Sequence, residues 1–173
     1  MVTIDHTELT RFLVEAIPQA YAGDGEEVSP WTPEFKELEY PKDGWPESPW
    51  YYCDSYQGFY QAPGREVVYF QQQPVWCRVY HGGMLLQHHG EEEFAKATFV
   101  FLKHVLGKID LHRPYWRGPS EFTQGDWRYE SEVEGDLKAF RGEERIYCKG
   151  TLVFQQWYGG GMILKKDTRV VSS

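Results

Sequence analysis

The chain contains one pattern twice, and this repetition constrains its fold more than any other feature of the sequence. When residues 50–84 are aligned with residues 127–162, with a single one-residue gap near Pro63, identical residues recur along both segments. The identical pairs are Trp50/Trp127, Tyr52/Tyr129, Gly58/Gly135, Ala62/Ala139, Gly64/Gly142, Glu66/Glu144, Tyr69/Tyr147, Val75/Val153, Tyr80/Tyr158, Gly82/Gly160, Gly83/Gly161 and Met84/Met162. Most of these are Gly, Trp, Tyr or Met, which chance rarely pairs, so we expect an internal duplication.

Each copy contains short runs of β-forming residues separated by Gly or Pro. The runs read WYYCDSYQG, REVVYF and PVWCRVYHGG in the first copy, and WRYESEVEG, EERIYC and TLVFQQWYGGG in the second. This order predicts an antiparallel meander in each copy. We expect a tight hairpin at Lys149 and Gly150, because Gly tolerates positive φ, whereas Pro74 at the equivalent place predicts a longer loop.

A helix is expected before each meander. Residues 94–105 carry apolar side chains at helical spacing, three glutamates precede them at the positive end, and Gly107 follows. Apolar residues at the same spacing earlier in the chain predict a helix over residues 7–16, and Pro18 ends this helix. The connectors to the two meanders, residues 29–49 and 113–125, are rich in Pro and aromatic residues, and the second predicts a short strand at residues 121–123.

These elements predict an α+β fold, in which a helix plus antiparallel meander is duplicated within one domain, residues 1–173. The two halves are residues 1–86 and 87–173. A helix covers one face of a sheet, so a second copy either extends the sheet at its edge or packs on it. We expect one curved sheet of six to eight strands with both helices on one side, and two packed sheets remain the alternative.

Composition argues against several classes of protein. Acidic residues outnumber basic ones by 26 to 18, and no Lys or Arg stripe follows either helix, so we expect no direct nucleic-acid partner. Cys53, Cys77 and Cys148 are odd in number and lie in expected strands, which predicts reduced cysteines in a cytoplasmic protein. We expect no secretion signal and no membrane span, because no segment approaches the ~20 apolar residues needed.

One strand face combines aromatic and polar side chains, and it is our candidate binding surface. Val75, Cys77 and Val79 alternate with bulkier residues, so the small side chains share one face of the strand. The other face and its neighbours supply the candidate ligand-binding residues Asp54, Tyr56, Trp76, Arg78, Tyr80 and His81, and the second copy offers Phe154, Gln156 and Tyr158. Such a face resembles a small-molecule pocket if it lines a cleft. Alternatively, the rings pack under the helices.

Other patterns favour structural roles. The repeated Tyr-x-Gly-Gly-Met ending lacks the Lys and Ser/Thr of a phosphate loop and suits a strand exit. His81, His88 and His89 lie near three glutamates, but their spacing matches no zinc pattern, so we expect no metal site. Paired carboxylates, Asp54 with Glu66 or Glu132 with Glu144, are acid–base candidates. No nucleophile motif is present, no catalytic residue is assigned, and no cofactor is expected.

Several motifs resemble the family known as domain of unknown function 5680. The resemblance lies in residues 12–25 (FLVEAIPQAYAGDG), 38–45 (LEYPKDGW), 64–70 (GREVVYF), 74–83 (PVWCRVYHGG), 113–122 (RPYWRGPSEF) and 133–150 (VEGDLKAFRGEERIYCKG). Members of that family occur alone and also behind an XRE-type helix-turn-helix, which implies a sensing or effector role in those fusions. We expect no such DNA reader in this chain, and the family implies no catalytic residues.

Three functions follow as hypotheses. The first is a ligand-binding or sensor-type module that uses the face around Trp76, Arg78 and Tyr80. The second is a small enzyme that acts through Asp54, Glu66 or His81 in a cleft between the repeats. The third is a protein-interaction module or homodimer whose exposed aromatic residues form a self-complementary patch.

Overall fold

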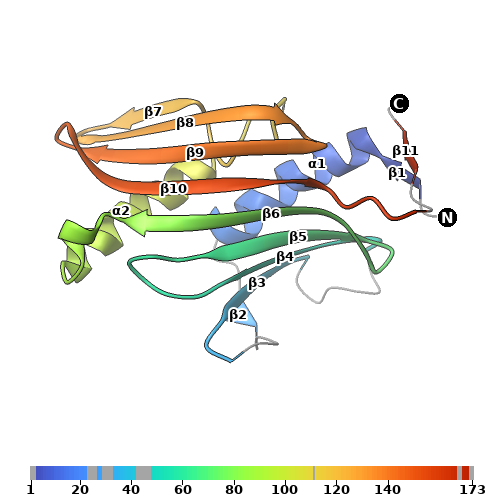
Figure 1. Cartoon of the computed structure of the whole chain (residues 1–173), viewed down its shortest axis with the longest axis horizontal. Coiled ribbons are helices and arrows are strands. Elements are labelled where there is room, and N and C mark those ends of the chain that lie inside the picture. Colours follow the sequence, from blue (N-terminus) through green and yellow to red (C-terminus); the bar gives the residue numbers. More distant parts are fainter. Residues whose placement is uncertain are drawn as a thin grey trace.

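The computed structural model describes residues 3–22, 27–28, 33–41, 48–110, 112–166 and 169–171 (Figure 1). The helices are α1 (His6–Ile17) and α2 (Glu92–Leu106), with a π-helical turn η1 (Pro18–Ala22) and a 3-10 turn η2 (Leu86–His88). The strands are β1 (Thr3–Asp5), β2 (Glu27–Val28), β3 (Lys36–Tyr40), β4 (Trp50–Tyr56), β5 (Gly64–Phe70), β6 (Gln73–Met84), β7 (Glu121–Gln124), β8 (Trp127–Asp136), β9 (Ala139–Cys148), β10 (Thr151–Met162) and β11 (Arg169–Val171).

Most strands join one open antiparallel sheet, in the order β2-β3-β4-β5-β6-β10-β9-β8-β7. The described residues therefore form an α+β fold with a single large sheet, and the alternative of two packed sheets is wrong. The two-residue β2 makes nine strands, one more than the expected range. A separate parallel pair joins β1 to β11, near the two chain ends in Figure 1.

Both helices form where their sequences predict. The Asp5 carboxylate caps α1 by accepting hydrogen bonds from the amides of Thr7 (2.7 Å) and Glu8 (3.2 Å). Glu92 and Glu93 lie in the first turn of α2, where negative side chains interact favourably with the positive end of the helix dipole. Neither described helix combines the length and the apolar composition that a membrane-spanning helix needs.

Both helices cover the same face of the sheet, which we call the inner face. Trp76 on β6 belongs to the apolar cluster that packs under α1, and Met84 on the same strand belongs to the cluster under α2. Residues an even number apart along a strand point to the same side, so the two clusters share a face. Figure 1 shows α1 and α2 together behind the strands. The other face, the outer face, exposes Val79 by 56% and Trp157 by 51%.

The β5–β6 and β9–β10 hairpins are both tight. Lys149 and Gly150 have φ of 50° and 79°, which confirms the expected turn. The longer loop expected at Pro74 is wrong, because Gln71 and Gln72 turn the chain with φ of 49° and 63°. Pro74 lies inside β6 beside a shift in register with β5, and such irregularities tolerate the missing amide donor.

The two longest strands, β6 and β10, join the halves of the sheet. Tyr80 lies directly opposite Tyr158, with Met84 opposite Phe154 at one end and Trp76 opposite Met162 at the other. From this central pair outward the strands run β6-β5-β4 on one side and β10-β9-β8 on the other. Tyr80 and Tyr158 therefore both lie at the middle of the inner face.

Candidate functional site

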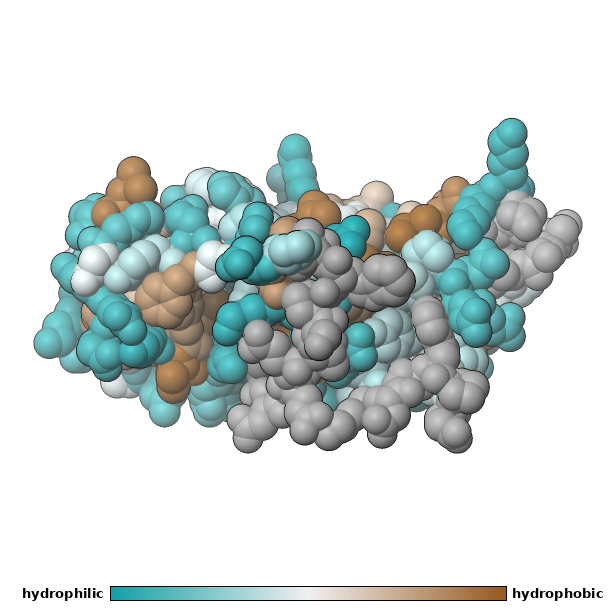
Figure 2. Space-filling view, turned by 90° about the horizontal axis from the view of Figure 1, so that it is seen from below, coloured by the Kyte–Doolittle hydropathy of each residue, from teal (hydrophilic) through white to brown (hydrophobic). Residues whose placement is uncertain are grey.

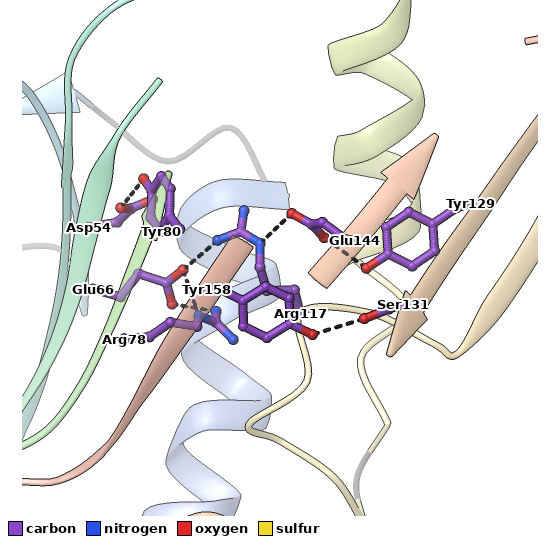
Figure 3. A network of polar contacts seen from close by, with 9 residues as sticks. All are labelled: Asp54, Glu66, Arg78, Tyr80, Arg117, Tyr129, Ser131, Glu144 and Tyr158. Atoms are coloured by element: carbon purple, nitrogen blue, oxygen red, sulfur yellow. Dashed lines mark hydrogen bonds and ion pairs between the residues drawn. The ribbon is translucent and has the colours of Figure 1, made fainter. Parts of the chain in front are cut away.

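A strip of buried polar side chains crosses the middle of the inner face, between the two apolar clusters. Nine of these residues form the network of contacts in Figure 3: Asp54, Glu66, Arg78, Tyr80, Arg117, Tyr129, Ser131, Glu144 and Tyr158. Each is less than a tenth exposed. Burying these charges costs desolvation free energy unless they are paired and hydrogen-bonded, so the partners of each charged group decide whether the strip is stable.

Arg117 connects the two halves of this network. It lies in the segment between α2 and β7, and its side chain inserts between two glutamates from different halves of the sheet (Figure 3). Its Nη1 donates to Glu66 Oε1 at 3.0 Å, and its Nε lies 2.9 Å from Glu144 Oε1. One guanidinium therefore bridges β5 to β9 across the central strands.

Glu66 also receives the second buried guanidinium. Arg78 on β6 lies opposite Glu66 on β5, and its Nε donates to Glu66 Oε1 at 3.0 Å while its Nη2 contacts Oε2. This two-pronged geometry suits a guanidinium and a carboxylate. The Arg78 guanidinium also lies 5.7 Å from the centre of the Trp76 ring. Arg78 is therefore held on several sides within the interior.

Tyrosine hydroxyls complete the network in both halves. Tyr80 donates to Asp54 Oδ1 at 2.7 Å, and Tyr129 donates to Glu144 Oε2 at 2.8 Å. The Tyr158 hydroxyl lies 2.8 Å from Ser131 Oγ. Each hydroxyl satisfies a polar partner that would otherwise be buried without a hydrogen bond.

Asp54 is a buried carboxyl of the strip whose pKa is raised. Burial raises the pKa of Asp54 to about 7, and the neighbouring Glu66 adds to this rise. The hydrogen bond from Tyr80 and the charges of Arg117 and Arg78 lower the same pKa but do not outweigh burial. Burial likewise raises the pKa of the Tyr80 hydroxyl well above its usual value. Asp54 can therefore exchange a proton near neutral pH, and the Tyr80 hydroxyl stays protonated.

A pocket of about 370 Å³ opens beside the polar strip. It lies between α2, the β4–β5 connection and the central strands, and its deep wall contains Tyr80, Arg117, Phe154 and Gln156. The outer wall is formed by Lys36, Tyr56, Gly58, Phe59, Ala62, Phe99 and Lys103. Seen from the β2–β3 side, hydrophobic residues reach the surface between hydrophilic ones (Figure 2). The volume is near the lower end of ordinary ligand sites, roughly 300–1,000 Å³.

Gln156 gives the deep wall an unsatisfied polar group. The residue is only 3% exposed, and its Oε1 is buried without a hydrogen bond to any residue that the structure describes. A buried amide oxygen of this kind costs about 1–3 kcal/mol unless it finds a donor. A ligand or an ordered water in the pocket would supply that donor.

The structure separates the six residues expected to bind a ligand. Tyr56 and Tyr80 line the pocket, and Asp54 lies one hydrogen bond behind Tyr80. Arg78 is buried against Glu66, and Trp76 is fully buried in the α1 cluster, where its indole donates to the Leu137 carbonyl at 3.1 Å. Trp76 thus packs under a helix, as the alternative interpretation held for the rings, whereas Arg78 is paired with Glu66 in the interior.

His81 does not join the other five residues. It follows Tyr80 on β6, so it points to the outer face, where its side chain is exposed. The other two histidines of the expected cluster have structural contacts: His88 Nδ1 lies 3.0 Å from Glu91 Oε2, and His89 stacks on Tyr60. No group of three or more potential metal ligands is found among the described residues.

Sequence reasoning missed Arg117, the residue that ties the network together. It lies in a connector without periodicity, so no pattern of burial pointed to it. The available signal was the motif RPYWRGPSEF, which holds a second arginine beside a Gly-Pro pair. Lys36 was also missed, because the strand β3 that carries it was not predicted within its long connector.

The family comparison can now be set beside this geometry. A model of the family described as Domain of unknown function (DUF5680) matches residues 54–163. The chain belongs to this family. The matched segment begins at Asp54 and includes every residue of the buried network, whereas α1 and Lys36 lie before it. A search of curated proteins found no match, and neither did a search of solved structures.

Proposed function

We propose that this DUF5680 chain is a ligand-binding, sensor-type module whose small-molecule ligand occupies the pocket beside Tyr80. The observation that carries the proposal is the deep wall, where Gln156 presents a buried amide oxygen without a partner among the described residues. Apolar walls with a few fixed polar groups are the usual composition of small-molecule sites. Tyr80 and Arg117 connect this wall directly to the buried network, so occupancy can affect both halves of the sheet.

We infer that the two halves arose by internal duplication of a helix plus meander. Equivalent residues in the alignment make equivalent contacts: Tyr80 bonds to Asp54, and Tyr158 contacts Ser131. The strand order on the two sides of β6 and β10 also corresponds. Tyr80 and Tyr158 lie opposite each other, as expected for residues next to a two-fold axis between the copies.

The pocket lies on only one side of this inferred axis. On the other side, Phe140 follows Ala139, the counterpart of the pocket residue Ala62. The Phe140 ring lies 5.6 Å from Trp76 and 5.7 Å from Tyr115, between ring centres. Aromatic packing therefore fills the space that is open beside Ala62, and we expect a single ligand per chain.

A ligand screen with a pocket-filling variant tests the proposal. We expect compounds from a broad metabolite set to raise the melting temperature of the wild-type chain, and Ala62→Leu to abolish this shift. Val100→Leu is the matched control, because Val100 is 69% exposed on α2 and does not line the pocket. Arg78→Ala is a poor test, since it leaves Glu66 with one buried partner fewer and threatens the fold.

Two outcomes would count against the proposal. A broad screen without any stabilising compound would remove its main support. A compound that shifts the melting temperature equally in wild type and Ala62→Leu would place binding elsewhere.

One observation favours an enzyme as the second candidate. Asp54 has a pKa of about 7 and is hydrogen-bonded to Tyr80, whose ring lines the pocket. This arrangement offers a carboxyl group that can take up or release a proton near neutral pH. If a compound found in the screen is turned over, Asp54→Asn should abolish turnover and leave binding within a few-fold; unchanged turnover would exclude this role of Asp54.

A further inference from the structure

We propose that the ligand is an uncharged, flat aromatic compound that donates one hydrogen bond from the edge of its ring to Gln156. This inference rests on the proposed ligand-binding function and names the class of ligand. It follows from the balance of charges beside the pocket, the aromatic side chains in its walls and the buried amide oxygen in its deep wall.

The charged residues that line the pocket are already engaged within the chain. Arg117 lies between Glu66 and Glu144, which it contacts at 3.0 and 2.9 Å (Figure 3). Lys36 and Lys103 also interact with other groups of the chain. No Asp or Glu is among the described residues that line the pocket. The described lining residues thus leave no free charge with which a charged ligand could pair.

Burial then favours a neutral ligand over a charged one. The deep wall contains Tyr80, Phe154 and Gln156, each less than a tenth exposed. A charged group that leaves water for such surroundings loses hydration free energy, which only a paired counter-charge restores. An uncharged ligand avoids this loss. We therefore expect neutral compounds to bind more tightly than charged relatives of the same shape.

The remaining walls suit a flat aromatic body. Phe99 stands edge-on to both Phe59 and Phe154, with 5.5 and 6.4 Å between ring centres. These three rings all line the pocket, and Leu102 of α2 adds an aliphatic side chain. Aromatic rings pack against one another in offset or edge-to-face geometry. A planar ring in the pocket would extend this arrangement.

Gln156 determines which polar group the ligand carries. Its side-chain oxygen is buried without a hydrogen bond to any described residue, and an amide oxygen accepts only from an N–H or O–H group. A donor at the edge of a flat ring reaches a buried atom with less displacement of the wall than a bulky substituent does. Pairing this oxygen removes the cost of leaving it unsatisfied, so the donor contributes to affinity.

Matched bicyclic probes test this class. Indole and benzothiophene are uncharged and have nearly the same planar shape, but only indole has an N–H donor. Indole-5-carboxylate and 5-(aminomethyl)indole keep that donor and add a negative or a positive charge. We expect both charged derivatives to bind the full chain several-fold more weakly than indole. Calorimetry measures the affinities, and chemical-shift mapping locates the site.

A variant of Gln156 tests the hydrogen bond. Gln156→Met keeps the length of the side chain and removes the amide, so the ratio of the affinity for indole to that for benzothiophene should fall roughly fivefold. Gln155→Met is the matched control and should leave this ratio unchanged, because Gln155 points to the outer face and does not line the pocket. If Gln156→Met does not fold, 1-methylindole makes the comparison in wild type: it lacks the donor and should bind more weakly than indole.

The outcomes separate the ligand class from the function. An affinity ratio that is the same in wild type and Gln156→Met, with binding sensitive to Ala62→Leu, would overturn the donor and keep the binding function. A charged derivative that binds more tightly than indole would overturn the neutral class. Failure of all the probes to bind would overturn the aromatic class, and the metabolite screen would still judge the function. Indole binding that Ala62→Leu does not weaken would contradict both proposals.

Discussion

The two halves of the inner face carry the same buried tyrosines and glutamates but differ in the polar residues around them. The first half has Asp54 and Arg78 where the second half has Ser131 and Gln156 at the aligned positions. The first half is thus charged and the second is mostly neutral. Arg117 enters from outside both meanders and supplies the cation that Glu144 does not receive from its own strands.

If the two halves arose by duplication, as proposed above, this difference shows how two copies can form an asymmetric interior. The central tyrosines, Tyr80 and Tyr158, are the same in both halves. Glu66 and Glu144 are also the same, whereas the positions of Asp54 and Arg78 carry neutral residues in the second half, and the pocket lies beside the first half. The unsatisfied amide oxygen of Gln156 aligns with Arg78, whose Nε and Nη2 bind Glu66 while its Nη1 has no hydrogen bond to a described residue.

The largest effect is expected from removing the bridge between the halves. Arg117→Met should lower the free energy of unfolding by about 3–5 kcal/mol, because it leaves two buried glutamates short of a cation. Urea denaturation at neutral pH measures this loss. Adding Glu144→Gln should recover part of it, and a double variant no more stable than Arg117→Met would contradict the bridge.

A smaller effect, on pH dependence, distinguishes Asp54 from its counterpart Ser131. Folding raises the pKa of Asp54 from 3.8 to about 7, so the folded chain holds a proton that the unfolded chain releases. This contribution of Asp54 favours folding at low pH and is lost progressively as pH rises from about 4 to 7.

Substituting Asp54 removes this titration. Asp54→Asn should therefore gain stability relative to wild type as pH rises through that range, by on the order of 2–4 kcal/mol. Ser131→Ala should show a constant difference from wild type. Urea denaturation from pH 4.5 to 8 measures both, and parallel curves for Asp54→Asn and wild type would refute the raised pKa.

Removing the hydroxyl of each central tyrosine compares the stability that one hydrogen bond contributes in each half. Tyr158→Phe should cost about 1 kcal/mol, since it removes a contact between two neutral hydroxyls. Tyr80→Phe should cost more above pH 7, because it leaves the ionised Asp54 without its donor. Thermal unfolding at pH 8 ranks the two variants, and an equal loss would show that the halves do not differ in this respect.

The smallest effect is expected one residue further along β6. His81 is exposed on the outer face, so His81→Ala should change the free energy of unfolding by less than about 0.5 kcal/mol. It should also leave ligand binding unchanged. A loss of binding would indicate that the outer face takes part in the site.

The sequence predicted the elements better than their long-range arrangement. Helix caps, apolar stripes and strand alternation are local, so α1, α2, β7 and the meanders appeared where expected. The strand β3 escaped because its residues, KELEY, alternate weakly and lie in a long connector. The sequence also predicted the face that holds Tyr56 and Tyr80, but it did not indicate that the pocket lies toward α2 while Trp76 packs under α1.

Arg117 marks the limit of sequence reasoning about the site. A lone arginine in a loop is ordinarily solvated, and only the meeting of β5 and β9 across the central strands creates two glutamates for it to bridge. Similarly, the space beside Ala62 is open in the first half and filled in the second. The second half has one more residue at the aligned place, between Ala139 and Gly142. Packing of this kind is decided by side chains distant in sequence.

The pairing of β1 with β11 brings the first and last described strands of the chain together, away from α2 (Figure 1). The order of the chain can therefore be rearranged without altering the large sheet. A circular permutant that joins the old ends by a short glycine-rich linker, and opens at the exposed Lys149–Gly150 turn, should retain the pocket. Its new ends would then lie beside β9 and β10, which offers two points for attaching fluorescent reporters to the second half.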